Sequence, residues 1–168
     1  MDILEIIKTR RSIRRYESTP VSKEELDKIL EAGRWAPSAD NSQPWRFIAL
    51  RSQEVRKKLA DMLTWGRFLS QAPLGIVVTV NPRASSHPME DGAAATQNIL
   101  LEAHSLGLGA CWIGAYGAGY EESAKKLLNV PDYERLIAVI AIGHPAESPQ
   151  GTRRKLDEVV FTDRYGNR

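Results

Sequence analysis

The chain of 168 residues carries a formal net charge of +2 and 42% hydrophobic residues, so we expect one soluble globular domain over residues 1–168. The small charge gives no reason to expect a nucleic-acid partner, and the longest apolar runs, such as residues 137–142, are far too short to cross a membrane. The single cysteine, Cys111, excludes an intrachain disulfide and suits a reducing cytoplasm.

A helix is predicted over residues 2–8, directly before a strongly basic segment. Asp2 and Glu5 have the spacing of a capping box, and their charges argue against a signal peptide. Residues 10–15 then read Arg-Arg-Ser-Ile-Arg-Arg. On charge patterning alone a solvated basic surface is the more common explanation, but guanidinium groups beside a hydroxyl also suit a phosphate.

Two further helices are predicted on either side of a short strand. Ser22 forms a capping box with Glu25 at the start of one helix, and Ser52 begins the other, with apolar residues at helical spacing in both. The strand between them covers residues 47–50. Residues 65–71 show no clear period and stay unassigned.

Between the first of these helices and the strand, residues 34–47 form a distinctive stretch. Six small or polar residues lie between Pro37 and Pro44, and each proline forces the preceding residue out of the helical region, so we expect a fixed loop. The polar run also lies between Trp35 and Trp45. Large aromatic side chains beside amides and hydroxyls favour a planar ligand with polar edges over a plain surface turn.

Residues 74–80 and 136–142 are almost continuously apolar, the pattern of buried strands. Between them a polar connection at 81–89 leads into a helix predicted over residues 91–106. Gly107 suits the position that closes this helix.

The Gly-x-Gly spacing at residues 107–109 suggests a dinucleotide fingerprint, but the third glycine would fall at Trp112 and the motif follows a helix, so we reject it. We predict instead a strand at 111–113, after which Gly114 would let backbone approach a flat ligand. A glycine-rich turn without a ligand is an equal alternative from these residues alone.

The last predicted helix covers residues 120–129, before the second apolar strand. The chain then becomes polar. Arg153, Arg154 and Lys155 precede a tail with too few apolar residues to form a compact unit.

Other chemistries have weaker signals. His87, His104 and His144 lack ligand spacing, and one cysteine is too few for structural zinc, so no metal site is expected. We expect His104 to be a core histidine with satisfied hydrogen bonds and Cys111 to be a buried thiol rather than a nucleophile. With no nucleophile elbow, P-loop or acid–base constellation, we assign no catalytic side chain.

Three blocks together resemble the FMN-dependent nitroreductase family (nitroreductase / NAD(P)H flavin oxidoreductase). They are residues 10–14, the Pro-Ser-x-x-Asn-Ser-Gln-Pro-Trp segment at residues 37–45, and residues 97–114. The blocks occur in the family's order and span most of the chain, so the combined match is more specific than any one block.

The resemblance implies an α+β fold with a mainly antiparallel central sheet of about four or five strands, flanked by helices, in an intertwined homodimer. It also implies an enzyme that uses FMN, with NADH or NADPH as reductant. Hydride would pass through flavin N5 in ping-pong fashion to a nitroaromatic or quinone acceptor. The flavin would carry the chemistry, while the protein supplies orientation and electrostatics.

Matching positions imply the residues that would bind FMN. Arg10, Arg11 and Ser12 would hold the phosphate and the ribityl chain. Arg14 would lie near flavin N1 and O2, where positive charge stabilises the reduced anion.

The rest of the implied site comes from three other segments. Its members would be Pro37, Ser38, Asn41 and Gln43 from the other subunit, Trp112, Ile113 and Gly114 along the flavin, and Arg153 or Arg154 at the phosphate. The C-terminal segment would reach across the partner subunit.

Several alternatives stay open. Related flavoproteins perform dehalogenation, flavin cleavage or dehydrogenation, and the protein could also bind flavin as a carrier or sensor without turnover. A nucleic-acid adaptor is disfavoured because Tyr16 is the one aromatic residue close to the basic segment.

The connection at residues 81–89 departs from longer family members, in which additional helical structure covers the active site here. We therefore expect an open flavin face, broad acceptor use and easy reoxidation by oxygen. The competing expectation is that residues 65–71 or a loop of the partner cover the site.

Overall fold

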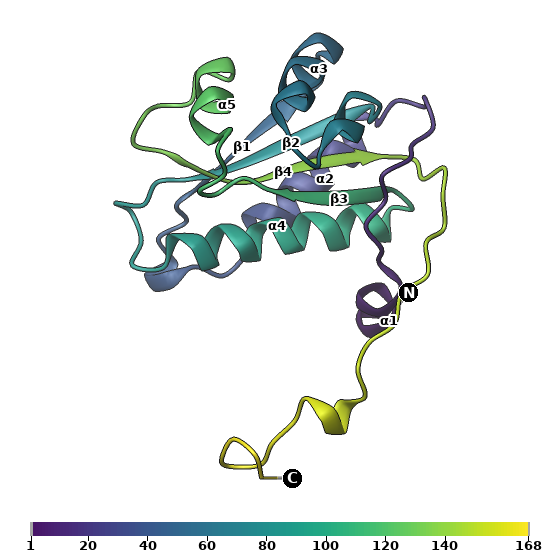
Figure 1. The fold of residues 1–168 in the computed structure, drawn as a ribbon, viewed down its shortest axis with the longest axis vertical. Coiled ribbons are helices and arrows are strands. Elements are labelled where there is room, and N and C mark those ends of the chain that lie inside the picture. Colours follow the sequence, from purple (N-terminus) through teal and green to yellow (C-terminus); the bar gives the residue numbers. More distant parts are fainter. Residues whose placement is uncertain (1, 168) are drawn as a thin grey trace.

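The computed structural model describes residues 2–167 and shows an α+β architecture around a four-stranded sheet (Figure 1). The strand order is β1-β2-β4-β3, and every neighbouring pair is antiparallel, which confirms the predicted topology. The strands are β1 (Trp45–Leu50), β2 (Leu74–Val80), β3 (Gly109–Gly114) and β4 (Arg135–Gly143).

The two central strands are those predicted from continuous apolar runs. Every residue of β2 is buried, and so is every residue of β4 after Arg135. Alternate residues pack into different layers, since Ile76 and Val78 join one core cluster while Val77 joins the other. Both faces of the sheet are therefore covered, and this explains why the runs do not alternate with polar residues.

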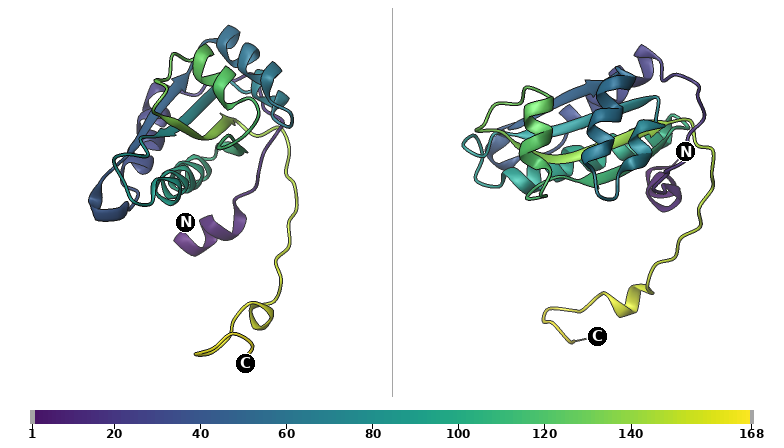
Figure 2. Two further views of the ribbon diagram at one scale, coloured as in Figure 1. Left: turned by 60° about the vertical axis from the view of Figure 1, so that its left-hand side comes forward. Right: turned by 45° about the horizontal axis from the view of Figure 1, so that its top comes forward.

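Helices cover the two faces of the sheet (Figures 1 and 2). On one face lie α2 (Lys23–Arg34) and the long α4 (Pro88–Ser105), and on the other lie α3 (Gln53–Met62) and α5 (Glu121–Leu127). A short N-terminal helix, α1 (Ile3–Thr9), lies beside α4. Single 3-10 turns cover Ala39–Asn41, Arg67–Ser70 and Leu156–Glu158.

Two of the three predicted helix caps are present in the structure. The Ser22–Glu25 capping box forms, with both reciprocal hydrogen bonds present. The box predicted for Asp2 and Glu5 is wrong, because the Asp2 side chain makes no capping bond and α1, with no buried residue, has no packing to fix its first turn. At the end of α4, Gly107 takes a φ of 80° and closes the helix as predicted.

The C-terminal segment, residues 146–167, extends away from the sheet and its helices (Figures 1 and 2). It carries Leu156, Val159 and Val160, all of which are exposed. Ile3 and Leu4 of α1 are exposed as well. Within residues 2–167, no helix combines the length and the apolar character needed to span a bilayer.

Candidate functional site

The basic N-terminal segment runs in extended form between β3 and the residues that follow β4. The Ile13 amide donates to the Ala110 carbonyl at 3.1 Å, and the Ala146 amide donates to the Arg15 carbonyl at 2.9 Å. A Cβ on Gly109 would come within 2.7 Å of Ile13, so only glycine permits this close approach. The segment is thereby fixed on both sides.

Two further contacts lock the same segment. The Glu147 carboxylate accepts from the Arg14 and Arg15 amides at 2.6 and 3.2 Å. The Tyr16 hydroxyl donates to the Ile13 and Ala141 carbonyls, and burial raises the pKa of Tyr16. Tyr16 therefore acts as a fixed donor, and the backbone that carries the arginines is held before any ligand arrives.

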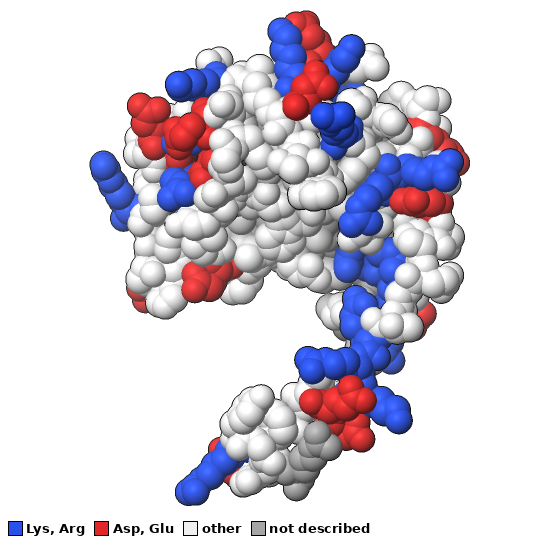
Figure 3. Space-filling model, in the orientation of Figure 1, with Lys and Arg blue, Asp and Glu red and all other residues white. Residues whose placement is uncertain are grey.

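One end of the segment concentrates positive charge. Burial, followed by repulsion from Arg153 and Arg11, lowers the pKa of Arg10. Among the ion pairs within residues 2–167, none includes these three arginines. Figure 3 shows basic side chains gathered where the C-terminal segment leaves the body. Glu147 lines a cavity with Arg10 and Arg11 but binds backbone amides, so the arginines form no ion pair with it and the cluster suits a bound anion.

The Arg11 side chain adds a second sign of an anion site. Its terminal nitrogen donates to the Lys8 and Arg10 carbonyls at 2.7 and 2.8 Å, while its Nε is buried and has no hydrogen-bond partner. A buried donor without an acceptor is costly, so a shift of the guanidinium that brought Nε to a ligand oxygen would relieve the cost. Arg10 and Arg11 line a cavity of about 280 Å³.

His104 lies on the wall of the same cavity. Its Nε2 is 2.8 Å from the Thr9 hydroxyl, so its hydrogen bonding is satisfied as predicted. The expected core position is wrong, because the last turn of α4 faces α1 and the arginines, which leaves the ring half-buried. Burial and the charges of Arg10 and Arg11 lower the pKa of His104.

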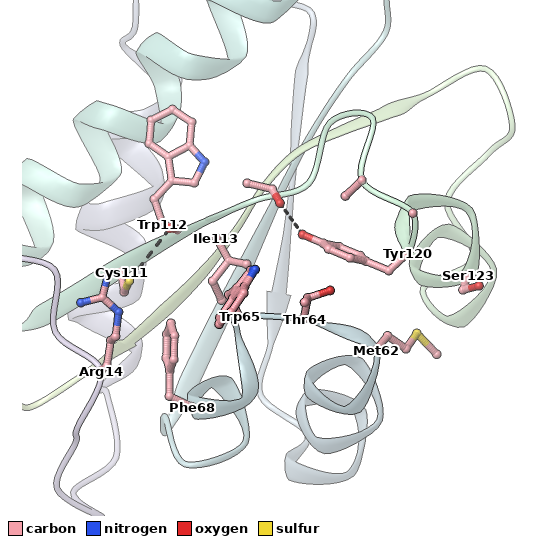
Figure 4. A pocket seen from close by; sticks show the side chains of 13 residues that line it. Arg14, Met62, Thr64, Trp65, Phe68, Cys111, Trp112, Ile113, Tyr120 and Ser123 are labelled. Atoms are coloured by element: carbon pink, nitrogen blue, oxygen red, sulfur yellow. Dashed lines mark hydrogen bonds between the residues drawn. The ribbon is translucent and has the colours of Figure 1, made fainter.

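The other end of the segment opens into a larger cavity of about 790 Å³ (Figure 4). Arg14 lies at one side, with its guanidinium carbon 5.9 Å from the centre of the Phe68 ring. Trp65 and Tyr120 also line the space. A volume of this size with aromatic walls and a single cation is typical of a site for a planar ligand.

The outer edge of β3 borders this cavity. Because the Ala110 carbonyl points away from β4 to meet Ile13, strand alternation directs the backbone groups of Trp112 and Gly114 to the same open edge. A Cβ on Gly114 would meet nothing within 4 Å, so the missing side chain leaves open space there. Ile113 faces the cavity, whereas the Trp112 indole points to the opposite face and packs against the core beside α4 (Figure 4).

The β3–α5 loop is anchored by a buried carboxylate that sequence reasoning missed. Glu121 accepts from the Gly117 amide at 2.8 Å, from the Leu136 amide at 3.0 Å, and from Arg135 through two bonds of 2.8 Å. Burial opposes ionisation of Glu121, but these bonds outweigh it and lower the pKa of the carboxyl. The loop also holds Tyr120, whose hydroxyl donates to the Gly114 carbonyl.

The Pro-Ser-x-x-Asn-Ser-Gln-Pro loop is rigid, as its two prolines predict, and its backbone is tighter than they require. Asp40, Asn41 and Gln43 all have φ between 48° and 53°, in the left-handed region. The Ser38 hydroxyl accepts from the Gln43 amide at 3.0 Å. Pro37, Asn41 and Gln43 are exposed, so the loop presents polar groups to the outside.

This loop lies at the opposite end of α4 from the arginine cluster. The Ala39 amide donates to Asp91 in the first turn of α4, whereas His104 in the last turn borders Arg10. The helix has 18 residues and is therefore about 27 Å long. The structure thus brings Arg10, Arg11, Ser12, Arg14 and β3 together, but not the loop that carries Ser38 and Asn41.

Arg153 and Arg154, the two candidates for a contact with the phosphate, differ in position. Both are exposed, but Arg153 lies close enough to Arg10 to lower its pKa, whereas Arg154 has no such effect. The Arg11 guanidinium also packs on Gly151, where a Cβ would be 3.1 Å from Nε. The start of the C-terminal segment therefore belongs to the arginine cluster.

The connection at residues 81–89 lies far from the aromatic cavity. The Ser85 hydroxyl donates to Asp91 at 2.5 Å, so this connection joins the Ser38 loop at the N-terminal end of α4. Trp65 and Phe68, from the stretch left unassigned in the sequence, line the cavity instead. These two residues form a wall of the cavity, and both expectations about its cover stay predictions.

The described residues hold neither a metal-binding cluster nor an accessible thiol. Within residues 2–167, no cluster of three His, Cys, Asp or Glu side chains lies in a position to hold a metal ion. Cys111 is buried as predicted, and burial raises the pKa of its thiol.

Comparison with known proteins gives consistent matches along the chain. The Nitroreductase family model matches residues 7–66 and 61–144. A protein of Methanothermobacter thermautotrophicus with the provisional name NADH dehydrogenase/NAD(P)H nitroreductase is 42% identical over 161 residues, which cover 94% of this chain and 84% of that protein.

Solved structures match equally well. An FMN-dependent nitroreductase from Clostridium difficile superposes with a TM-score of 0.92 at 32% identity, over 96% of this chain and 99% of that one. A provisionally named nitroreductase from Desulfovibrio desulfuricans, solved in complex with FMN, has a TM-score of 0.85 at 36% identity and covers 98% of each chain.

Proposed function

The chain belongs to the nitroreductase family of oxidoreductases, and from this premise we propose that it binds FMN and transfers electrons from NADH or NADPH to nitroaromatic or quinone-type acceptors. One observation carries the proposal. A single segment, held on both sides, places an arginine cluster without ion pairs in the described part of the chain at one end and an aromatic-walled cavity at the other. FMN has a phosphate at one end and a planar ring at the other.

The phosphate would lie at the arginine cluster. Arg10, Arg11 and Arg153 would supply charge, Ser12 of the same segment would supply a hydroxyl, and the Arg11 Nε has no hydrogen-bond acceptor of its own in the described chain. The guanidinium groups can bind phosphate oxygens through charge-assisted hydrogen bonds. The residues present therefore fit the group.

The ring would lie along the open edge of β3. Arg14 would place positive charge beside the pyrimidine edge, and the Trp112 and Gly114 amides would donate to ring atoms. The space left by the missing Gly114 side chain allows close approach of a flat group. The roles of Arg14, Ile113 and Gly114 follow from this placement.

The site is proposed to be completed in a homodimer. Pro37, Ser38, Asn41 and Gln43 of the partner subunit would supply the polar groups that the same chain, about 27 Å away along α4, cannot deliver. Exposed apolar residues on α1 and on residues 156–160 support a second copy as their cover.

When bound, FMN would accept hydride from NAD(P)H at N5 and return the electrons to a second substrate. This chain would bind the phosphate, orient the ring and hold positive charge near the pyrimidine. Because reductant and acceptor would use one cavity in turn, we expect ping-pong kinetics, seen as parallel lines in double-reciprocal plots. Intersecting lines would contradict the shared cavity.

Purified protein tests the proposal directly. A yellow preparation that releases FMN on denaturation, together with steady-state NAD(P)H oxidation in the presence of a quinone, is the expected result. A colourless protein with no affinity for added FMN would overturn the proposal. A protein that binds FMN without oxidising NAD(P)H would be a carrier or sensor instead.

A further inference from the structure

Trp65 is 87% exposed although it lines the larger cavity (Figure 4). It lies between α3 and the 3-10 turn Arg67–Ser70. An exposed tryptophan forgoes the large hydrophobic gain that burial of an indole provides. At the wall of a cavity, such a ring is available to a ligand.

The backbone that carries Trp65 is firmly held. Leu63 and Leu69, on either side, are almost completely buried in the core. A Cβ on Gly66 would come within 2.6 Å of Leu63 and 3.0 Å of Ile113, so the segment packs tightly against β3. The Trp65 side chain thus projects from a fixed position rather than from a loose loop.

Other aromatic rings complete the walls. Phe68 lies under the Arg14 guanidinium, and Tyr120 comes from the β3–α5 loop with its hydroxyl tied to the Gly114 carbonyl (Figure 4). Both rings are fixed by these contacts, whereas the Trp65 indole makes no hydrogen bond among the described residues. Trp65 is the wall residue with the most free aromatic surface.

We propose that Trp65 is the specificity-determining residue for the electron acceptor, stacking on planar aromatic acceptors such as quinones and nitroaromatics. The inference rests on the proposed function and names the substrate class that this cavity selects. Aromatic stacking rewards a flat π-system and gives nothing to an acceptor that lacks one.

The test compares Trp65→Leu, which keeps apolar bulk without the ring, with Trp65→Phe, which keeps a ring. Tyr133→Leu, at a half-exposed aromatic residue outside the cavities described, is the matched control. For each FMN-loaded protein, the dissociation constant of 2-methyl-1,4-naphthoquinone is measured without reductant from the change in flavin absorbance. Turnover with the quinone and with ferricyanide, which has no aromatic plane, provides the second readout.

We expect Trp65→Leu to weaken quinone binding about three- to tenfold, the range for loss of an aromatic pair, while Trp65→Phe restores most of it. The KM for ferricyanide should rise less than the dissociation constant of the quinone in Trp65→Leu, and Tyr133→Leu should leave FMN affinity and both acceptors unchanged. Equal quinone binding by the wild type, Trp65→Leu and Trp65→Phe would overturn the inference and leave the proposed function intact. An equal loss for the quinone and for ferricyanide would do the same. Wild-type protein that holds no FMN would overturn both.

Discussion

The two polar segments of the proposed site are held in different ways. Residues 10–15 lie between β3 and Glu147 and carry arginines without acidic partners. The loop at residues 37–43 lies at the far end of α4, where its backbone is tight and its polar groups are exposed. Residues 10–15 carry positive charge that suits an anion. The loop at residues 37–43 presents amides and hydroxyls that suit a polar ligand. In the proposed homodimer each segment would form half of a site, so a complete site would need two chains.

The largest expected effect concerns Glu121, which anchors the β3–α5 loop at the aromatic cavity beside the first segment. Glu121→Ala leaves Arg135 and two backbone amides without their acceptor, so unfolding should become easier by about 3 kcal/mol, and the β3–α5 loop should lose its fixed position. Urea denaturation measures the stability. Glu54→Ala, which removes an exposed helix pair with Lys58, is the control and should change little.

The same carboxylate makes the stability of the folded protein depend on pH. Because its folded-state pKa is lowered, Glu121 contributes stability above its unfolded pKa and loses it as pH falls through the folded pKa. The wild type should therefore lose stability on acidification below about pH 4 more steeply than Glu121→Gln. Parallel pH profiles for the two proteins would contradict this role.

The second effect concerns the arginine cluster. Arg10→Ala should weaken FMN binding about ten- to a hundredfold, equivalent to about 1.5–3 kcal/mol for a charge-assisted contact, with the fold intact. Fluorescence titration of apoprotein with FMN measures it. Arg15→Ala, an exposed arginine of the same segment, should bind FMN like the wild type. Unchanged affinity in Arg10→Ala would return the segment to a solvated basic surface.

A smaller effect is expected in the other half. Asn41→Ala removes an uncharged amide from the loop, so FMN affinity should fall about three- to tenfold. The substitution also places alanine at a φ of 53°, so Asn41→Gly, which tolerates this conformation, separates backbone strain from loss of the amide. Equal loss in both variants assigns the effect to the amide, whereas normal binding by Asn41→Gly would remove Asn41 from the site.

The smallest effect concerns His104. Burial and the neighbouring arginines lower its pKa, so the unfolded chain binds a proton more readily, and apoprotein stability should rise with pH until about pH 6.5. His104→Gln should remove this part of the pH dependence. FMN should weaken it in the wild type, since a phosphate offsets the arginine charges. Thermal melts of apo and FMN-loaded protein between pH 5 and pH 8 measure it.

Residues with one dominant physical role were predictable from the sequence. The apolar runs of β2 and β4 leave no choice but buried strands, and the Ser22–Glu25 spacing fixes the start of α2. Asp2 and Glu5 have the same spacing without the result, because α1 has no buried face to hold it. Local pattern therefore predicts structure where packing supports it.

The aromatic wall of the cavity and the buried Glu121 were not predicted from the sequence, for a related reason. Trp65 and Phe68 have no helical or strand period, and their place in the cavity depends on Leu63, Gly66 and Leu69 packing against β3. Two aromatic residues in an unassigned stretch before a buried strand were the available signal. Glu121 could not be distinguished from an exposed helix-start residue until Arg135 was placed beside it.

Complementation between defective chains tests the two-chain site most directly. One chain carries Arg10→Ala and Arg11→Ala, and the other carries Ser38→Ala and Asn41→Ala, so each should lose FMN affinity alone. In mixed dimers one site combines both defects and the other is intact, so an equal mixture should recover wild-type affinity in about a quarter of all sites. FMN titration of the co-expressed mixture measures this fraction. Recovery near a quarter is the predicted result, and a mixture that binds as weakly as either double variant would contradict the account.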